Sequence, residues 1–128
     1  MSGNGKGSGK DGLRLLFSCS GAEDTAEIGD RAARKVDREG TAKMSCLVGV
    51  GGGVDDILND ARAANRLVVV DGCDNECAAK LLRKAGFDKF MHLRVTDLGF
   101  EKGDSPVTDE NVDEVAEALS ELLGVREA

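Results

Sequence analysis

The chain has 128 residues, a length that suits one domain, and 41% of them are hydrophobic, which is enough for a single core. Only 3% are aromatic, so this core must be built from Val, Leu, Ile and Ala. The formal net charge of −7 argues against nucleic acid as a partner, because phosphate backbones are bound by basic faces.

The first twelve residues are Gly, Ser, Lys and Asn with almost nothing apolar. Such a segment cannot bury enough surface to offset the entropy of ordering it, so residues 1–12 are predicted to be a flexible tail. The segment also lacks the apolar stretch of a signal peptide, and no run in the chain reaches membrane-spanning length. We therefore expect a cytoplasmic protein with no membrane partner and one domain over residues 13–128.

Four short apolar runs alternate with four amphipathic stretches in the order βαβαβαβα. Strands are predicted at residues 13–17, 42–50, 67–70 and 90–95. Helices are predicted at residues 22–36, 54–64, 78–85 and 109–123, the last capped by Thr108. Continuously apolar strands separated by helices indicate a parallel sheet covered on both faces. The sequence therefore predicts a doubly wound, three-layer α/β domain of the Rossmann-like class, with a four-stranded parallel sheet.

Cysteines follow the first three predicted strands. Cys19, Cys46 and Cys73 each lie just after, or at the end of, one of these strands, 27 residues apart. In a parallel sheet all three therefore lie at the carboxyl edge, where ligands bind in open α/β sheets. Strand orders 2-1-3-4 and 3-2-1-4 would both bring the three cysteines close together, and the sequence does not choose between them.

Cys77 is the fourth candidate ligand. Its spacing of four residues from Cys73 predicts that both lie on one face of the first helical turn. Four thiolates from separate segments suit tetrahedral Zn²⁺, and nearby helix amino termini favour the thiolate form. The Gly51–Gly53 loop could also offer N–H groups to the sulfurs. The sequence thus predicts a metal site formed by Cys19, Cys46, Cys73 and Cys77.

The residues around these cysteines resemble a known family. Asp71-Gly72-Cys73 after a Val-rich strand is similar to the motif for which the DGC-domain family is named. The likeness extends to Cys19-Ser20-Gly21, Lys43–Leu47 and Val95–Gly99, and it covers about residues 13–103. The resemblance implies that the four cysteines correspond one for one to zinc chelators of the family. It does not indicate an activity, so whether the protein is an enzyme stays open, and protein partners stay unknown.

Three other roles for the cysteines remain open. Four thiolates can hold an iron–sulfur cluster, although the usual spacings are absent. Cys73 and Cys77 could instead cycle between dithiol and disulfide, with Cys19 or Cys46 attacking first. One cysteine could act as an enzyme nucleophile with Asp71 as its acid–base partner. If all four bind one metal, however, no position remains for an activated water, which disfavours hydrolysis.

Several other residues have simpler explanations. Asp71, at a strand end before glycine, is typical of a residue that fixes a turn through backbone hydrogen bonds. His92 lies within the fourth predicted strand and away from the edge, so we do not expect it to be a ligand. The C-x5-R spacing from Cys77 to Arg83 falls in a helix interior, which cannot form a phosphate loop. Met91 is predicted to be a core residue.

Overall fold

The computed structural model describes residues 12–124. Residues 1–11 of the predicted tail therefore lie outside the described residues. The strands are β1 (Arg14–Ser18), β2 (Lys43–Met44), β3 (Arg66–Asp71) and β4 (Met91–Arg94). The helices are α1 (Asp24–Arg38), α2 (Leu47–Gly51), α3 (Asp55–Ala63), α4 (Cys77–Lys84) and α5 (Asp109–Leu122), with a 3-10 turn η1 (Val95–Leu98). No helix in the described part of the chain is both long and apolar enough to cross a membrane.

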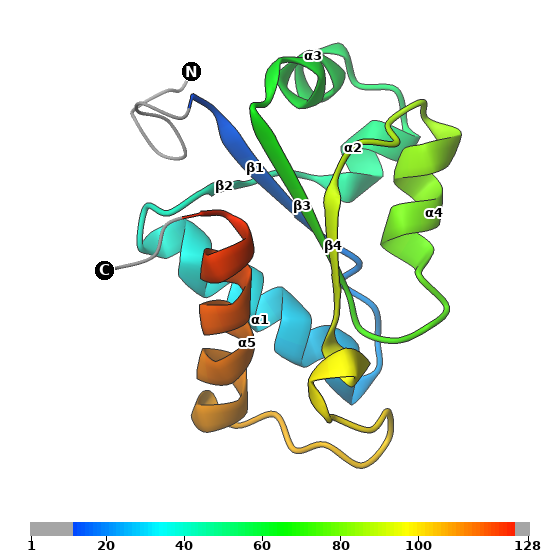
Figure 1. Ribbon diagram of the computed structural model, residues 1–128. Helices are drawn as coiled ribbons and strands as arrows, with labels where there is room; N and C mark the ends of the chain where they lie inside the picture. The colour runs from blue at the N-terminus through cyan, green and yellow to red at the C-terminus, as the bar shows by residue number, and fades with distance from the viewer. Residues whose placement is uncertain (1–11, 125–128) are drawn as a thin grey trace.

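The four strands form one parallel sheet in the order β2-β1-β3-β4. This confirms the predicted α/β class and selects the first of the two strand orders that the sequence allowed. Helices α1 and α5 cover one face of the sheet, and α2, α3 and α4 cover the other (Figure 1). The chain therefore leaves β1 and β3, which are neighbours, toward opposite faces. That divergence is the switch point at which open α/β sheets bind ligands.

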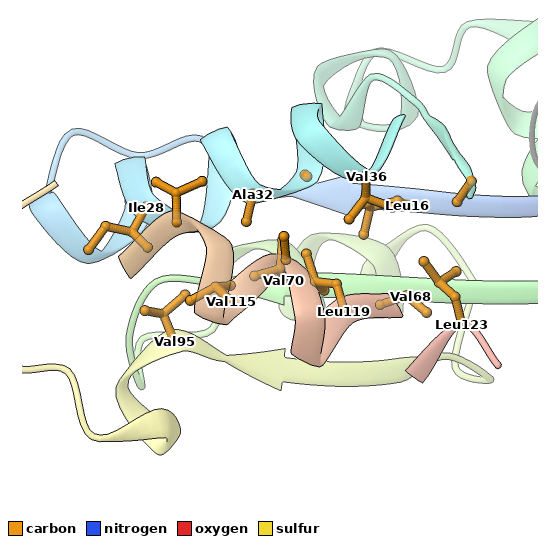
Figure 2. Packing of buried hydrophobic residues seen from close by; sticks show 14 residues of the cluster. Leu16, Ile28, Ala32, Val36, Val68, Val70, Val95, Val115, Leu119 and Leu123 are labelled. Atoms are coloured by element: carbon orange, nitrogen blue, oxygen red, sulfur yellow. The ribbon is translucent and has the colours of Figure 1, made fainter. Parts of the chain in front are cut away.

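Side chains of the two central strands alternate between two apolar clusters. Leu16 and Val70 pack with residues of α1 and α5, as Figure 2 shows. Leu15, Phe17 and Val69 pack on the other face with residues of α2, α3 and α4. Because both faces are buried, the strands have no polar alternation, and this is why they are continuous apolar runs in the sequence.

The strand predicted at residues 42–50 is wrong in its second half. Only Lys43–Met44 pairs with β1, and helix α2 begins at Leu47. The N–H of Ser45 donates to the carbonyl of Leu16 at 2.9 Å, after which the chain leaves the sheet. Val50 is then buried by α2 against the α3–α4 side of the sheet, so a helix satisfies the apolar pattern that suggested a strand. Gly51 ends this helix, which shortens the predicted glycine loop.

The edge position of β4 explains a second difference. Met91 begins this strand and has 41% of its surface exposed, so its prediction as a core residue is wrong. Among residues 12–124, strand β4 pairs with β3 on one side and has no strand neighbour on its outer side. A single apolar side chain in the sequence carries no information on whether its strand is central or at an edge.

The N-cap predicted for the last helix is confirmed and gives a first testable expectation. The side-chain oxygen of Thr108 accepts the N–H of Asn111 at 3.1 Å. Thr108→Ala should therefore lower the free energy of unfolding by about 1 kcal/mol, measured by chemical denaturation. Thr108→Ser keeps the acceptor and should stay close to the wild type. Equal losses for the two variants would contradict the capping role.

Candidate metal centre

The four cysteines lie in three loops that follow neighbouring strands. Cys19 follows β1, Cys46 lies between β2 and α2, Cys73 follows β3, and Cys77 is the first residue of α4. All four are free thiols. Cys46 and Cys77 are exposed, whereas Cys19 and Cys73 are half-buried. The order β2-β1-β3 thus sets the three cysteine-bearing loops side by side, with the loop of Cys19 in the middle.

The turn after β1 holds Cys19 against β3. The N–H of Cys19 donates to the carbonyl of Val70 at 3.1 Å, one residue beyond the end of β1. Ser20 then adopts a left-handed conformation with φ of 52°, which is unfavourable for a residue other than glycine. Its N–H donates to the hydroxyl of Ser18 at 3.2 Å, and its own hydroxyl donates to Asp30 at 2.5 Å. These bonds compensate for the strain and fix the direction of the turn.

The sulfur of Cys19 lies among groups from the loops after β1 and β3. Burial raises the pKa of the Cys19 thiol above its ordinary value, and the charges of Asp71 and Cys77 raise it further. Backbone hydrogen bonds from Gly21 and Gly72 act in the opposite direction and favour the thiolate. Cys19 is therefore a half-buried sulfur that has N–H donors in place and a second cysteine within electrostatic reach.

A cleft joins Cys19 to Cys46. The cleft has a volume of about 530 Å³ and lies between the carboxyl ends of β1 and β2, with Arg34 and Arg38 of α1 on its wall. Arg34 donates to Asp30 at 2.8 Å. Burial pushes the pKa of Asp30 up, but its hydrogen bonds, that of Arg34 foremost, outweigh burial and hold the pKa below its usual range. Cys19 thus borders both the cleft that contains Cys46 and the loop that leads to Cys77.

The glycine of the Asp71-Gly72-Cys73 motif has a steric reason. A Cβ atom at Gly72 would lie 2.6 Å from both the backbone nitrogen and the Cα of Ala26 in the first turn of α1. No side chain fits at that distance, because the obstacle is backbone that cannot rotate away. Gly72 therefore lets the loop after β3 pack directly on the start of α1, beside the turn that carries Cys19.

Asp71 organises the start of α4. Its carboxylate is 1% exposed and accepts the N–H groups of Ala78 at 2.8 Å and Ala79 at 3.2 Å. These are N–H groups of the first helical turn, which have no partner inside the helix. The predicted structural role of Asp71, through backbone hydrogen bonds, is confirmed. The same carboxylate oxygen that binds Ala79 also lies 2.8 Å from Nε2 of His92.

The pairing of Asp71 with His92 was not predicted from the sequence. His92 lies within β4, as expected, and the strand register sets it opposite Val69, two residues before Asp71. Residues in that diagonal relation lie on the same face of a sheet. The only signal for this pair is the register between β3 and β4, which the sequence does not contain.

The prediction that Cys73 and Cys77 share one helical turn is wrong. Helix α4 begins at Cys77, and its N-cap residue Glu76 has a left-handed φ of 56°. Cys73 lies before this reversal, in a turn where its carbonyl accepts the N–H of Glu76 at 3.3 Å. A spacing of four residues therefore does not put the two cysteines on one helix face.

The C-x5-R spacing is coincidental, as predicted, because Arg83 lies inside α4.

The donor atoms fit zinc in type and number, but they do not form a preassembled group. Within residues 12–124 no three His, Cys, Asp or Glu side chains are gathered closely enough to hold a metal ion. The four thiols nevertheless come from adjacent loops, and thiolate sulfur is a preferred ligand of Zn²⁺. The fold thus brings the cysteine-bearing segments to one edge of the sheet, while no three of the sulfurs are gathered together in the described residues.

Comparison with known proteins agrees with the motif. Residues 15–119 match the model of the DGC domain. The chain belongs to the DGC domain family. It is also 33% identical over 92 residues to the "Anaerobic and virulence modulator AnvM" of Pseudomonas aeruginosa, which is 72% of this chain and 70% of AnvM. No solved structure matches the chain. The resemblance inferred from Asp71-Gly72-Cys73 is confirmed. The DGC motif begins at the last residue of β3 and forms the start of the loop that leads to α4.

The packing of this motif gives a second testable expectation. Gly72→Ala should lower the free energy of unfolding by about 1–3 kcal/mol, because the added methyl group overpacks the contact with Ala26. Gly51→Ala is the matched control, since its Cβ would meet Leu81 at an ordinary 3.5 Å. Alanine is also the better helix former, so this control should not lose stability. Chemical denaturation measures both, and a neutral Gly72→Ala would contradict the close approach.

Asp71 gives a third expectation. In Asp71→Asn one carboxylate oxygen becomes an NH₂ group, which cannot accept a backbone N–H at the start of α4. The free energy of unfolding should fall by about 1–3 kcal/mol, the cost of a buried group left without its hydrogen bond. The exposed Asp88→Asn is the control and should stay within about 0.5 kcal/mol of the wild type. Equal stability of both variants in chemical denaturation would rule out this role for Asp71.

Proposed function

We propose that this DGC domain binds one Zn²⁺ ion through the thiolates of Cys19, Cys46, Cys73 and Cys77. The observation that carries the proposal is the strand order, which makes the three cysteine-bearing loops neighbours at one edge of the sheet. Cys19 is the central ligand in this proposal, because it shares a cleft with Cys46 and lies within electrostatic reach of Cys77.

The surroundings of Cys19 support a bound cation. A metal ion would offset the cost of burying a thiolate, and the N–H groups of Gly21 and Gly72 would stabilise the sulfur from the second shell. Since no three of the candidate side chains in residues 12–124 are grouped, binding requires the cysteines to rotate toward Cys19. Cys46 and Cys77 are exposed, so their side chains have room for this motion.

We propose metal handling as the role of this site in preference to a purely structural zinc. Two exposed ligands leave a metal within reach of solvent and of other molecules, as acquisition and release require. Coordination by four thiolates leaves no position for an activated water, so a binding role fits better than hydrolysis. We place the protein in the cytoplasm, because thiols stay reduced there.

Thiol redox chemistry is the second candidate. Cys73 and Cys77 could cycle between dithiol and disulfide, with Cys19 or Cys46 attacking first. Cys19 and Cys77 are a further pair to test, because the two thiols interact electrostatically. An iron–sulfur cluster would use the same four cysteines.

One purification separates these functions. The protein is purified under reducing conditions without chelator, and its metal content, visible spectrum and free thiols are measured. The zinc proposal predicts a colourless protein with about one zinc per chain, because four thiolates form one tetrahedral site. Brown protein with iron and sulfide would contradict it in favour of a cluster. Metal-free protein in which two of the four cysteines form a reversible disulfide would favour redox chemistry.

Cys46→Ser gives a fourth expectation, which separates metal binding from folding. Because Cys46 is exposed, the variant should keep its metal-free stability within about 0.5 kcal/mol of the wild type. Zinc at 1,000 times its Kd should raise the unfolding free energy of the wild type by about 4 kcal/mol, and of the variant by much less. Ser45→Ala, a neighbour on the same cleft, should retain the full zinc effect. Equal stabilisation of Cys46→Ser and wild type would exclude Cys46 as a ligand.

A further inference from the structure

The loop of residues 101–105 is tied to the first turn of α1. One carboxylate oxygen of Asp24 accepts the N–H of Gly103 at 2.9 Å, and the other accepts the N–H of Ser105 at 3.0 Å. Ser105 is 7% exposed and closes the loop on itself, since its hydroxyl donates to the carbonyl of Glu101 at 2.7 Å and accepts its N–H at 2.8 Å. This 101–105 loop lies in the segment between η1 and α5, at the lower end of the sheet in Figure 1.

These bonds set the position of Lys102. The N–H groups of Gly103 and Ser105 hold the pKa of Asp24 below its usual range, so Asp24 stays charged and keeps the loop in place at neutral pH. Nζ of Lys102 lies 3.7 Å from the sulfur of Cys73, which is 29 residues away in the sequence. A lysine on an unrestrained loop would lose this contact, because its long side chain has many rotamers.

Lys102 is the cation that contacts Cys73, and it is less firmly paired than Arg94. Arg94 is held by Asp97 at 3.0 Å and by Glu76 at 3.2 Å, and its pKa is raised by Asp97 in particular. The carboxylate nearest to Lys102, that of Glu23, is at 3.9 Å, a longer separation than in either pair of Arg94. Lys102 is therefore the cation that combines contact with a cysteine sulfur and only a weak tie to a carboxylate.

We propose that Lys102 compensates the charge of the metal centre at Cys73, and that Asp24 is the residue that positions it. The proposal rests on the proposed function. A Zn²⁺ ion with four thiolates carries two net negative charges, in a chain whose own net charge is −7. An ammonium group against one sulfur stabilises that charge when metal is bound and slows release of Cys73 from the metal. Hydrogen bonds and charges in the second shell tune metal sites in this way.

The test measures zinc affinity of the full chain by competition with a chromophoric chelator, together with the rate of zinc release to excess chelator. Lys102→Met should weaken binding about tenfold or more and speed release correspondingly. Lys102→Arg keeps the charge and should restore most of the affinity. Lys84→Met removes the same charge from the exposed last turn of α4 and should bind as the wild type does. An equal loss in Lys84→Met would mean that net charge alone matters, and would overturn the proposal.

A double-mutant cycle tests whether Asp24 acts through Lys102. Asp24→Asn should weaken zinc binding, and the double variant Asp24→Asn/Lys102→Met should bind no more weakly than Lys102→Met alone. If Asp24 serves only the fold, the two losses of affinity multiply instead, and this overturns the positioning role. If the wild type and Lys102→Met bind zinc equally well, this inference is wrong and the proposed function still stands. A wild-type protein that binds no zinc contradicts the proposed function and this inference with it.

Discussion

The pairing of β1 with β3 is the constraint on which the rest of the site depends. These strands leave the sheet toward opposite faces, so the loops after them diverge and leave space at the carboxyl edge. The hydrogen bond from Cys19 to Val70 extends their contact beyond the strand, and the packing of Gly72 on Ala26 closes the loops against each other. Any change in this pairing would separate the cysteines.

Polar groups around this edge divide into those that build it and those that remain for a ligand. The carboxylate of Asp71 is used by the start of α4 and by His92, and that of Asp24 is used by the 101–105 loop. Both are therefore structural groups and not free ligands. The four thiols remain, two of them exposed. An edge of this kind, with a built frame around four free thiols, is consistent with the proposed binding of a cation.

Regular elements and the motif could be predicted from sequence, while contacts that depend on register could not. The apolar run at 67–70 and the capped helix at 109–123 are local patterns, and both were predicted with bounds close to β3 and α5. The strand prediction at 42–50 was wrong in part because an apolar segment can be buried as a strand or as a helix face. The elements packed against it determine which of the two forms. His92 stood out in the sequence as a lone histidine within a strand, without a sign of its partner.

The sequence by itself determined the α/β class and the DGC family, and it singled out the four cysteines that we propose as sulfur donors, because each is contained in local pattern or motif. The tertiary structure decided the strand order, the separation of Cys73 from Cys77 by the left-handed Glu76, and the contact between Lys102 and Cys73. The strand order and the Lys102–Cys73 contact arise where segments distant in the chain pack together. The conformation of Glu76 is local, but a non-glycine residue with a positive φ has no clear signal in the sequence. The sequence therefore gives the four cysteines of the candidate site, and the packing of their loops decides how exposed these thiols are and which charges surround them.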